Sequence, residues 1–258
     1  MRQSYNTLFS LEGRSALITG GARGIGSSIG EAFVDLGAKV AIVDIDEARG
    51  REQTARLRER GGEVEFLAAD ITVSSRVESV FDAVLSRFGT LDVVVNNAGV
   101  SARVPAESYP DADLDFIIDL NLKAVFYVMR AAARRWIDAK RAGRIINLAS
   151  FAGLVADPLS APYAATKGAV VQLTRTCAVE WGPHGILVNA IGPGYVRTDM
   201  TARTLDEPEA GAIIRAKTAL GRPATPEEIA GAAVFLASAA SSYVTGHILM
   251  VDGGWTAA

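Results

Sequence analysis

Short runs of β-branched residues alternate with longer segments of helical periodicity along the whole chain of 258 residues. We expect seven strands, at residues 15–19, 39–43, 63–67, 91–95, 144–148, 186–190 and 247–251. Several of these runs are apolar on both faces, which is typical of a sheet that is covered on both sides. Because parallel strands are joined by crossovers, the alternation predicts an α/β fold with a doubly wound parallel sheet between two helical layers.

The segments between the strands predict helices and a single domain. We expect helices at residues 24–36, 47–60, 74–88, 113–139, 162–181 and 226–237. No repeat, low-complexity tract or polar linker divides the chain, so one domain should span residues 1–258. The one long irregular region, at about residues 192–225, contains three prolines. Such a loop is usually functional, so we expect it to cover the substrate, with a poorly packed insertion as the alternative.

Composition narrows the classes of function. Apolar residues make up 49% and charged residues 21%, so the chain can bury a sizeable core. A net charge of −3 gives no reason to expect nucleic acid or an anionic membrane as partner, and no run reaches the roughly 18 apolar residues of a membrane span. The only cysteine, Cys177, favours a reducing compartment, and we expect a cytoplasmic protein. His184 and His247 have no cluster of further ligands, so we expect no zinc site.

A glycine-rich segment, TGGARGIG at residues 19–26, follows the first strand and opens the first helix. Glycines there allow the backbone to approach a pyrophosphate, and the helix N-terminus offers free N–H groups and the positive end of its dipole. A tight connection is the structural alternative, but the position in the first βαβ unit favours a dinucleotide. The expected cofactor contacts in this turn are Gly20, Arg23, Gly24, Ile25 and Gly26.

Acidic residues at later strand ends bear on the choice of dinucleotide. Asp44 ends the second strand, where its carboxylate can bind the adenosine ribose and would repel a 2′-phosphate. It could instead cap the next helix, although Asp46 could also fill that role. Arg23 favours NADP, because a guanidinium beside the turn could pair with the 2′-phosphate. We give Asp44 more weight and expect NAD, with NADP as the alternative. Asp70 and Ile71 are expected to contact the adenine, unless Asp70 only starts a helix.

Tyr163 and Lys167 are four residues apart in an expected helix and therefore lie on one face. An ammonium near a phenol favours the phenolate and lowers the tyrosine pKa from about 10, as acid–base chemistry at a carbonyl or alcohol requires. Such a pair is also common on exposed helix faces, so it is weak evidence alone. Ser150 ends the fifth strand and could donate to a substrate oxygen or serve as an ordinary turn residue.

Five motifs occur in one order along the chain: residues 19–26, residues 96–99 (NNAG), Asn121, Ser150 with Tyr163-x3-Lys167, and Pro193-Gly194. Together they resemble the short-chain dehydrogenase/reductase family over about residues 11–255, and the closing residues 251–254 (VDGG) resemble the C-terminus of that family. The resemblance implies a Rossmann-type sheet and an enzyme that transfers a hydride between a nicotinamide dinucleotide and an alcohol or ketone.

The resemblance also implies roles for individual residues. Tyr163 would exchange a proton with the substrate oxygen, which Ser150 would orient. Lys167 would bind the nicotinamide ribose and lower the pKa of Tyr163, and Asn121 would hold a water in a proton relay through Lys167. The implied contacts are Asn97, Ala98 and Gly99 at the adenosine half, and Pro193, Gly194, Val196 and Thr198 at the nicotinamide end.

Within the family, residues 8–11, 162–170 and 192–201 most resemble sugar-acid and polyol oxidoreductases of the gluconate 5-dehydrogenase type. This implies a small hydroxylated substrate whose secondary alcohol and ketone interconvert, and a homotetramer. Arg103, Arg197 and Arg203 could bind a substrate carboxylate, but the mixed charges of residues 196–222 are equally typical of a surface loop. The alternatives are an NADPH-dependent ketoreductase, such as one acting on 3-oxoacyl thioesters, and a dinucleotide-binding regulator without turnover.

Overall fold

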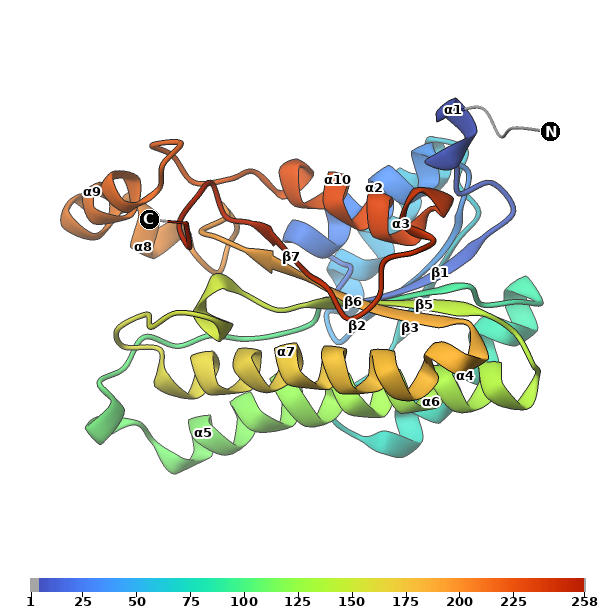
Figure 1. The fold of residues 1–258 in the computed structure, drawn as a ribbon, viewed down its shortest axis with the longest axis horizontal. Helices are drawn as coiled ribbons and strands as arrows, with labels where there is room; N and C mark the ends of the chain where they lie inside the picture. Colours follow the sequence, from blue (N-terminus) through green and yellow to red (C-terminus); the bar gives the residue numbers. More distant parts are fainter. Residues whose placement is uncertain (1–4, 258) are drawn as a thin grey trace.

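The seven strands form one parallel sheet in this computed structural model, which describes residues 5–257 (Figure 1). They are β1 (Ser15–Thr19), β2 (Lys39–Asp44), β3 (Val64–Ala68), β4 (Val93–Asn96), β5 (Gly143–Leu148), β6 (Ile186–Pro193) and β7 (Ile248–Val251). Their order in the sheet is β3-β2-β1-β4-β5-β6-β7, and every neighbouring pair is parallel. The chain winds outward in both directions from β1 and β4, which confirms the predicted doubly wound sheet and places the switch point between these two strands.

Helices cover both faces of the sheet. They are α1 (Tyr5–Leu8), α2 (Gly24–Asp35), α3 (Glu47–Glu59), α4 (Ser74–Phe88), α5 (Asp111–Ile118), α6 (Val125–Asp138), α7 (Ala161–Trp181), α8 (Ala202–Asp206), α9 (Pro208–Lys217) and α10 (Pro226–Ala237). One apolar layer joins α4, α6 and α7 to the sheet, and the other joins α2, α3 and α10 to the opposite face (Figure 1). Strands that are apolar on both faces are therefore buried on both faces, as their sequences predict.

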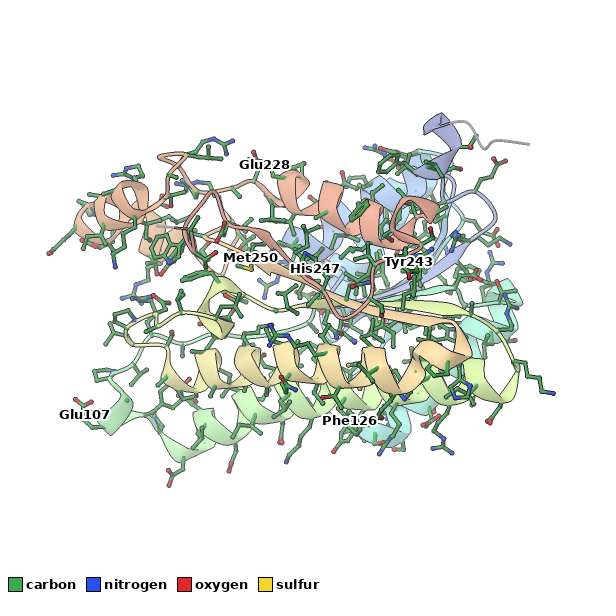
Figure 2. All side chains as sticks on the ribbon, in the orientation of Figure 1. Glu107, Phe126, Glu228, Tyr243, His247 and Met250 are labelled. Atoms are coloured by element: carbon green, nitrogen blue, oxygen red, sulfur yellow. The ribbon has the colours of Figure 1, made fainter. Side chains whose placement is uncertain are left out.

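Local signals set the ends of several helices as expected. α4 has the predicted bounds and ends at Gly89, whose φ of 76° is the left-handed conformation that glycine adopts without strain. α10 also has its predicted bounds and starts at Pro226, whose missing N–H costs nothing in a first turn. Before it, the backbone N–H of Thr225 donates to Glu228 Oε2 at 2.9 Å; Glu228 is labelled in Figure 2. Among residues 5–257, no helix is long and apolar enough to cross a membrane.

The expected helix over residues 113–139 is interrupted. α5 ends at Ile118, a π-helical turn follows at η2 (Asp119–Ala124), and α6 begins at Val125. A π-helical turn keeps the chain helical while widening one turn, so the apolar periodicity on either side still predicts a helix. The side chain of Asn121 is fully buried in this turn.

The expectation of an irregular region at residues 192–225 was wrong for much of its length. β6 continues to Pro193, and the two helices α8 and α9 follow. The carboxylate of Glu207 caps α9 and accepts from the N–H of Glu209 at 3.1 Å, while Pro208 occupies the first turn. Leu205 and Ile214 are buried, which anchors both helices. In Figure 1 they lie at the end of the molecule where the strands have their carboxyl ends.

Candidate active site

The carboxyl end of β5 and the first turns of α7 bring the three predicted catalytic side chains together. Ser150 follows β5, and its Oγ accepts from the N–H of Ala152 at 3.1 Å, which leaves its own proton available to another acceptor. Lys167 is only 5% exposed, and its Nζ donates to the carbonyl of Leu148 at 2.6 Å. The same Nζ lies 5.6 Å from the centre of the Tyr163 ring. The structure therefore places an amine, a phenol and a hydroxyl at one edge of the sheet.

Desolvation governs the acid–base properties of this group. It raises the pKa of Tyr163, and a hydrogen bond from the Ser150 hydroxyl lowers that pKa only in part. Burial lowers the pKa of Lys167 to about 8. The net direction for Tyr163 is opposite to the lowering that we expected from the lysine. The reason is that the ammonium lies over the ring and donates to the backbone of Leu148, so desolvation of the phenol is the largest effect.

Asn121 connects the catalytic helix to the loop after β4. Its Oδ1 accepts from the N–H of Val100 at 2.9 Å, and its Nδ2 donates to the carbonyl of Val100 at 2.8 Å. A Cβ on Gly99 would stand 3.1 Å from Asn121 Oδ1 and 3.6 Å from Lys167 Nζ, so the glycine lets this loop approach the lysine closely. Nδ2 also donates to Thr166 Oγ1 of α7 at 3.4 Å, and the second lone pair of Oδ1 is left for the water of the predicted relay, which stays a prediction.

The glycine-rich turn is held against the end of β4. Gly20 has a φ of 63°, and a Cβ there would lie 2.8 Å from the Cα of Ala98. A Cβ on Gly26 would lie 2.3 Å from the carbonyl oxygen of Gly20, so neither position accepts a larger residue without a shift. Asn97 Nδ2 donates to that same carbonyl at 2.8 Å. These contacts give Asn97 and Ala98 a bracing role beside the turn.

The N-terminus of α2 meets the requirements of a pyrophosphate site. Gly24 and Ile25 form its first turn, and no side chain among the described residues caps its N–H groups. No acidic residue stands in that turn, so nothing there would repel a phosphate. Gly24 has a φ of 57°, and a Cβ on it would lie 3.4 Å from Thr198 Cγ2. The residues therefore fit a dinucleotide whose phosphates bind between the turn and the segment after β6.

The carboxylate of Asp44 is available for the predicted contact with the adenosine ribose. Its Oδ2 accepts from the N–H of Ala22 at 3.2 Å and its Oδ1 from the N–H of Asp46 at 3.1 Å. The cap of α3 is Asp46, which accepts from the N–H of Arg49 at 3.1 Å. The half-buried carboxylate of Asp44 thus lies beside the glycine-rich turn and is not needed to cap the helix.

The carboxylate of Asp70 accepts hydrogen bonds at the start of a helix. Its Oδ1 accepts from the N–H of Thr72 at 2.9 Å and from Thr72 Oγ1 at 2.7 Å, in the turn before α4. Ile71 is buried and packs in the core below the sheet edge. These contacts match the helix-start alternative for Asp70, and the adenine contact of both residues stays a prediction.

The segment after β6 folds back over the glycine-rich turn. Pro193 is the last residue of β6, and the N–H of Gly194 donates to the carbonyl of Val251 at 3.0 Å. Val196 is buried and forms a bridge with Ala224, and its carbonyl accepts from the hydroxyl of Thr201. The predicted nicotinamide-end residues therefore form one continuous stretch that leads from the sheet to α8.

Asp199, which sequence reasoning missed, joins this segment to the adenosine end of the site. Its Oδ2 accepts from Arg23 Nη1 at 3.1 Å and from Arg49 Nη1 at 3.1 Å. The arginines are 176 and 150 residues away along the chain, so no local pattern could have indicated this contact. The carboxylate thus pairs with one arginine of the glycine-rich turn and one arginine of α3.

An aromatic cluster beside the catalytic group was also missed. The rings of Phe151, Tyr195 and Trp255 lie with their centres 5.0 to 5.3 Å apart. Burial raises the pKa of Tyr195 to about 12, so its hydroxyl is protonated, and it donates to Asp157 Oδ1 at 3.2 Å. The cluster brings together the residue after Ser150, the segment after β6 and the C-terminal residues.

Arg103, which we considered as a ligand for a substrate carboxylate, already has protein partners. Its Nη1 donates to Tyr195 Oη at 3.2 Å and to Asp157 Oδ2 at 3.4 Å, and its Nη2 donates to the carbonyl of Pro158 at 3.1 Å. Arg197 is paired with Asp206 at 2.8 Å. No group of three or more His, Cys, Asp or Glu side chains within residues 5–257 is arranged to hold a metal ion.

Comparisons with known proteins agree with this geometry. A family model described as enoyl-(acyl carrier protein) reductase matches residues 20–256. The chain is 40% identical over 259 residues to gluconate 5-dehydrogenase of Gluconobacter oxydans, a match that covers 98% of both proteins. It is 40% identical over 257 residues to galactitol 2-dehydrogenase of Rhizobium johnstonii, covering 98% of this chain and 99% of the relative.

A solved structure shows the same likeness in three dimensions. The crystal structure of a gluconate 5-dehydrogenase from Burkholderia cenocepacia, in complex with NADP and tartrate, has a TM-score of 0.94 to this chain. The two are 38% identical, and the match covers 98% of each chain. The likeness to these relatives, in sequence and in structure, therefore covers nearly the full length of the chain.

Proposed function

Since the chain belongs to the short-chain dehydrogenase/reductase family, we propose that it interconverts a secondary alcohol and a ketone on a sugar acid or polyol. The observation that carries this proposal is the meeting of Ser150, Tyr163 and Lys167 at the sheet edge that also holds the glycine-rich turn. Relatives of similar length act on gluconate and galactitol according to their names, which supports a small hydroxylated substrate.

The side chains of this site would supply the proton chemistry of the reaction. A nicotinamide dinucleotide, when bound, supplies or accepts the hydride. In reduction, Tyr163 donates its phenolic proton to the carbonyl oxygen, which also accepts a hydrogen bond from Ser150. In oxidation, the phenolate of Tyr163 accepts the proton of the hydroxyl group. Because the pKa of Tyr163 is raised, the phenol is protonated at neutral pH, which favours reduction there and oxidation in alkaline solution. Lys167 would bind the nicotinamide ribose.

We propose NAD as the preferred cofactor. The carboxylate of Asp44 lies beside the turn, where it would accept hydrogen bonds from the ribose hydroxyls and repel a 2′-phosphate. The guanidinium groups of Arg23 and Arg49 could offset that repulsion, but both are paired with Asp199. A 2′-phosphate would have to compete with this second carboxylate for them, which supports NAD, although the Burkholderia relative was crystallised in complex with NADP.

An NADPH-dependent ketoreductase is the second candidate, and the two arginines are the observation that favours it. Arg23 and Arg49 both donate to the same oxygen of Asp199, and rotation of Asp199 away would leave Arg23 unpaired and Arg49 with only its 3.6 Å pair with Asp46. A dinucleotide-binding regulator without turnover is a weaker alternative, because the acid–base group is complete.

We propose a homotetramer built on two apolar surfaces. The first lies on α5 and α6, where Phe116 and Phe126 are exposed; Phe126 is labelled in Figure 2. The second is the edge strand β7 with the neighbouring Tyr243, whose side chain is fully exposed (Figure 2). An unpaired apolar edge strand is a liability that a second copy would remove. Light scattering that gives a monomer at micromolar concentration would refute this assembly.

The buried, free Cys177 supports a reducing compartment, which we propose to be the cytoplasm.

Absorbance at 340 nm tests the function directly. Purified protein is mixed with NAD or NADP and with gluconate, galactitol or a simple secondary alcohol, and the reverse reaction is followed with the corresponding ketones. We expect turnover of the sugar acid or polyol with a higher kcat/KM for NAD. A higher kcat/KM for NADP, or activity only on acyl thioesters, would favour the second candidate. Cofactor binding without turnover of any substrate would favour the regulator.

A further inference from the structure

A cavity lies at the amino ends of the strands, at the end of the sheet opposite the candidate active site. It has a volume of about 490 Å³ and opens among the amino ends of β1, β5 and β6, at the end of the molecule away from α8 and α9 in Figure 1. Its charged lining residues are Glu12, Arg14, Asp92, Arg141 and Arg144. A cavity of this volume is in the range of small-molecule sites, and nothing in the proposed reaction uses it.

Arg144, at the start of β5, is a buried cation without an acidic partner. Its side chain is nine-tenths buried, yet it forms no ion pair with any acidic side chain among residues 5–257. Its Nη1 donates only to neutral acceptors, Ser241 Oγ at 3.0 Å and the carbonyl of Leu236 at 3.4 Å. Buried charges are normally paired, because removing a lone charge from water is costly. The end of α10, where Leu236 lies, provides only the partial negative charge of a helix C-terminus.

A second arginine adds to the positive charge at Arg144. The half-buried Arg14 immediately precedes β1 and forms no ion pair within the part of the chain that the structure describes. Burial first, and then the charge of Arg14, lowers the pKa of Arg144 to about 10, so the two guanidinium groups are close enough to repel each other. An anion between them would reduce the repulsion between the two guanidinium groups, and it would give the buried Arg144 a counter-ion.

The acidic residues of the cavity do not neutralise this pair. Asp92 Oδ2 accepts from the N–H of Ser15 at 3.0 Å, and its Oδ1 accepts from Arg141 Nη2 at 3.2 Å. Asp92 and Arg141 therefore neutralise each other. Glu12 is exposed and forms no ion pair within residues 5–257. The uncompensated charge of the cavity is thus positive and is concentrated at Arg14 and Arg144.

We propose that this cavity binds a small anionic metabolite, whose phosphate or carboxylate group is held between Arg14 and Arg144. Arginine suits this role because its planar donors can bind two oxygens of either group at once. The cavity is larger than one such group needs, so the rest of the metabolite has room beside it. The strand β5 separates the site from Ser150, and the proposal stands whether or not the proposed oxidoreductase activity is correct.

Equilibrium dialysis with the full-length protein tests the proposal. The probes are inorganic phosphate and succinate, each at constant ionic strength, in the presence of saturating NADH or NADPH so that the pyrophosphate site is already filled. We expect saturable binding of at least one probe to one site in each chain, and the tighter probe identifies the head group. Substitution Arg14→Gln should weaken that binding about 10- to 100-fold, as the loss of one charge-assisted hydrogen bond predicts.

Matched variants separate a built site from general charge effects. Arg51→Gln removes the same charge from an exposed arginine of α3, which is paired with Glu47, and should leave the affinity unchanged. Arg144→Met should weaken binding as much as Arg14→Gln does. If the Arg144→Met variant does not fold, the affinity of Arg14→Gln alone tests the proposal. The absence of saturable binding of both probes would overturn the proposal, and so would an unchanged affinity in Arg14→Gln.

Discussion

The two ends of the candidate active site differ in how far they are exposed to water. At the acid–base end, Lys167 is 5% exposed and Ser150 is equally buried, and the pKa values of Lys167 and Tyr163 are shifted by desolvation. At the adenosine end, the side chains of Arg23 and Asp199 are 60% and 65% exposed, and their ion pair is open to solvent. Burial therefore sets the chemistry at one end, while at the other end water screens each charge.

This difference indicates which properties of the site a single substitution can change. Exposed ion pairs contribute up to about 1 kcal/mol each, so cofactor preference should shift by small factors when one of them is lost. Buried polar groups have no water to replace a lost partner, so the acid–base end should respond by orders of magnitude. The following predictions test this comparison.

The largest effect is expected for Tyr163→Phe. Removing the phenolic proton should lower kcat/KM about 10²- to 10⁴-fold, the usual contribution of a general acid–base catalyst. Dissociation constants for the cofactor, measured by fluorescence titration, should change little. As a control, Tyr243→Phe alters a fully exposed tyrosine and should leave kcat/KM unchanged. A variant Tyr163→Phe that retains most of its activity would remove this residue from the mechanism.

Lys167→Met should change how stability depends on pH. The native pKa of about 8 lies below the ordinary 10.5, so between these values the unfolded state binds a proton that the native state does not. The contribution of Lys167 to stability should therefore rise with pH from about 8 to 10.5, by on the order of 3 kcal/mol. Denaturant titrations from pH 7.5 to 9.5 should show that rise, and Lys167→Met should lack it.

The control for that experiment is Lys217→Met, which removes an exposed lysine. It should keep the same rise in stability as the unsubstituted protein. Identical pH dependence in Lys167→Met would show that the buried amine does not cause the rise.

Ser150→Ala should lower kcat/KM about 10²-fold, since one donor to the reacting oxygen is lost. It should also shift the pH profile, because the Ser150 hydroxyl lowers the pKa of Tyr163. Without it, the alkaline rise in alcohol oxidation should move to higher pH. Ser150→Thr keeps the hydroxyl and should restore the position of that rise. An unshifted profile in Ser150→Ala would mean that the hydroxyl acts on the substrate alone.

The smallest effect is expected at the exposed end. Asp199→Ala frees Arg23 and leaves Arg49 with only its 3.6 Å pair with Asp46, and the dissociation constant for NADP should fall about 3- to 10-fold relative to that for NAD. The gain should diminish at high salt, where exposed charges are screened. Asp206→Ala, which breaks the pair with Arg197 in the same segment, should leave the ratio unchanged. An equal shift in both variants would indicate a general charge effect.

Much of the fold could be read from local patterns. The strand runs and the turn at residues 19–26 have their signals within a few consecutive residues, and the strands and most helices fall within a few residues of their predicted places. The helices α8 and α9 are not predicted from the sequence, because three prolines in residues 192–225 favour irregular structure when they are considered without their positions. Pro208 in fact occupies the first turn of α9, where proline is favourable.

The candidate site likewise has features that local patterns predict and features that depend on distant segments. The positions of Ser150 at a strand end and of Tyr163 and Lys167 on one helix face are local features, and the family resemblance of these motifs predicts a catalytic group. The direction of the Tyr163 pKa was predicted wrongly, because desolvation depends on everything packed around the phenol. The partners of Arg103 and Asp199 could not be predicted either, since they come from segments far away along the chain.

The sequence by itself determined the type and order of the strands and of most helices, the glycine-rich turn and the motifs of the proposed acid–base group. Each of these depends on residues that are neighbours in the chain. Only the tertiary structure decided that Asp199 pairs with Arg23 and Arg49, that Arg103 is bonded to Tyr195 and Asp157, and that Arg144 is buried without a counter-ion among the described residues. These properties depend on which distant segments meet and how much water remains between them, and no local pattern specifies either.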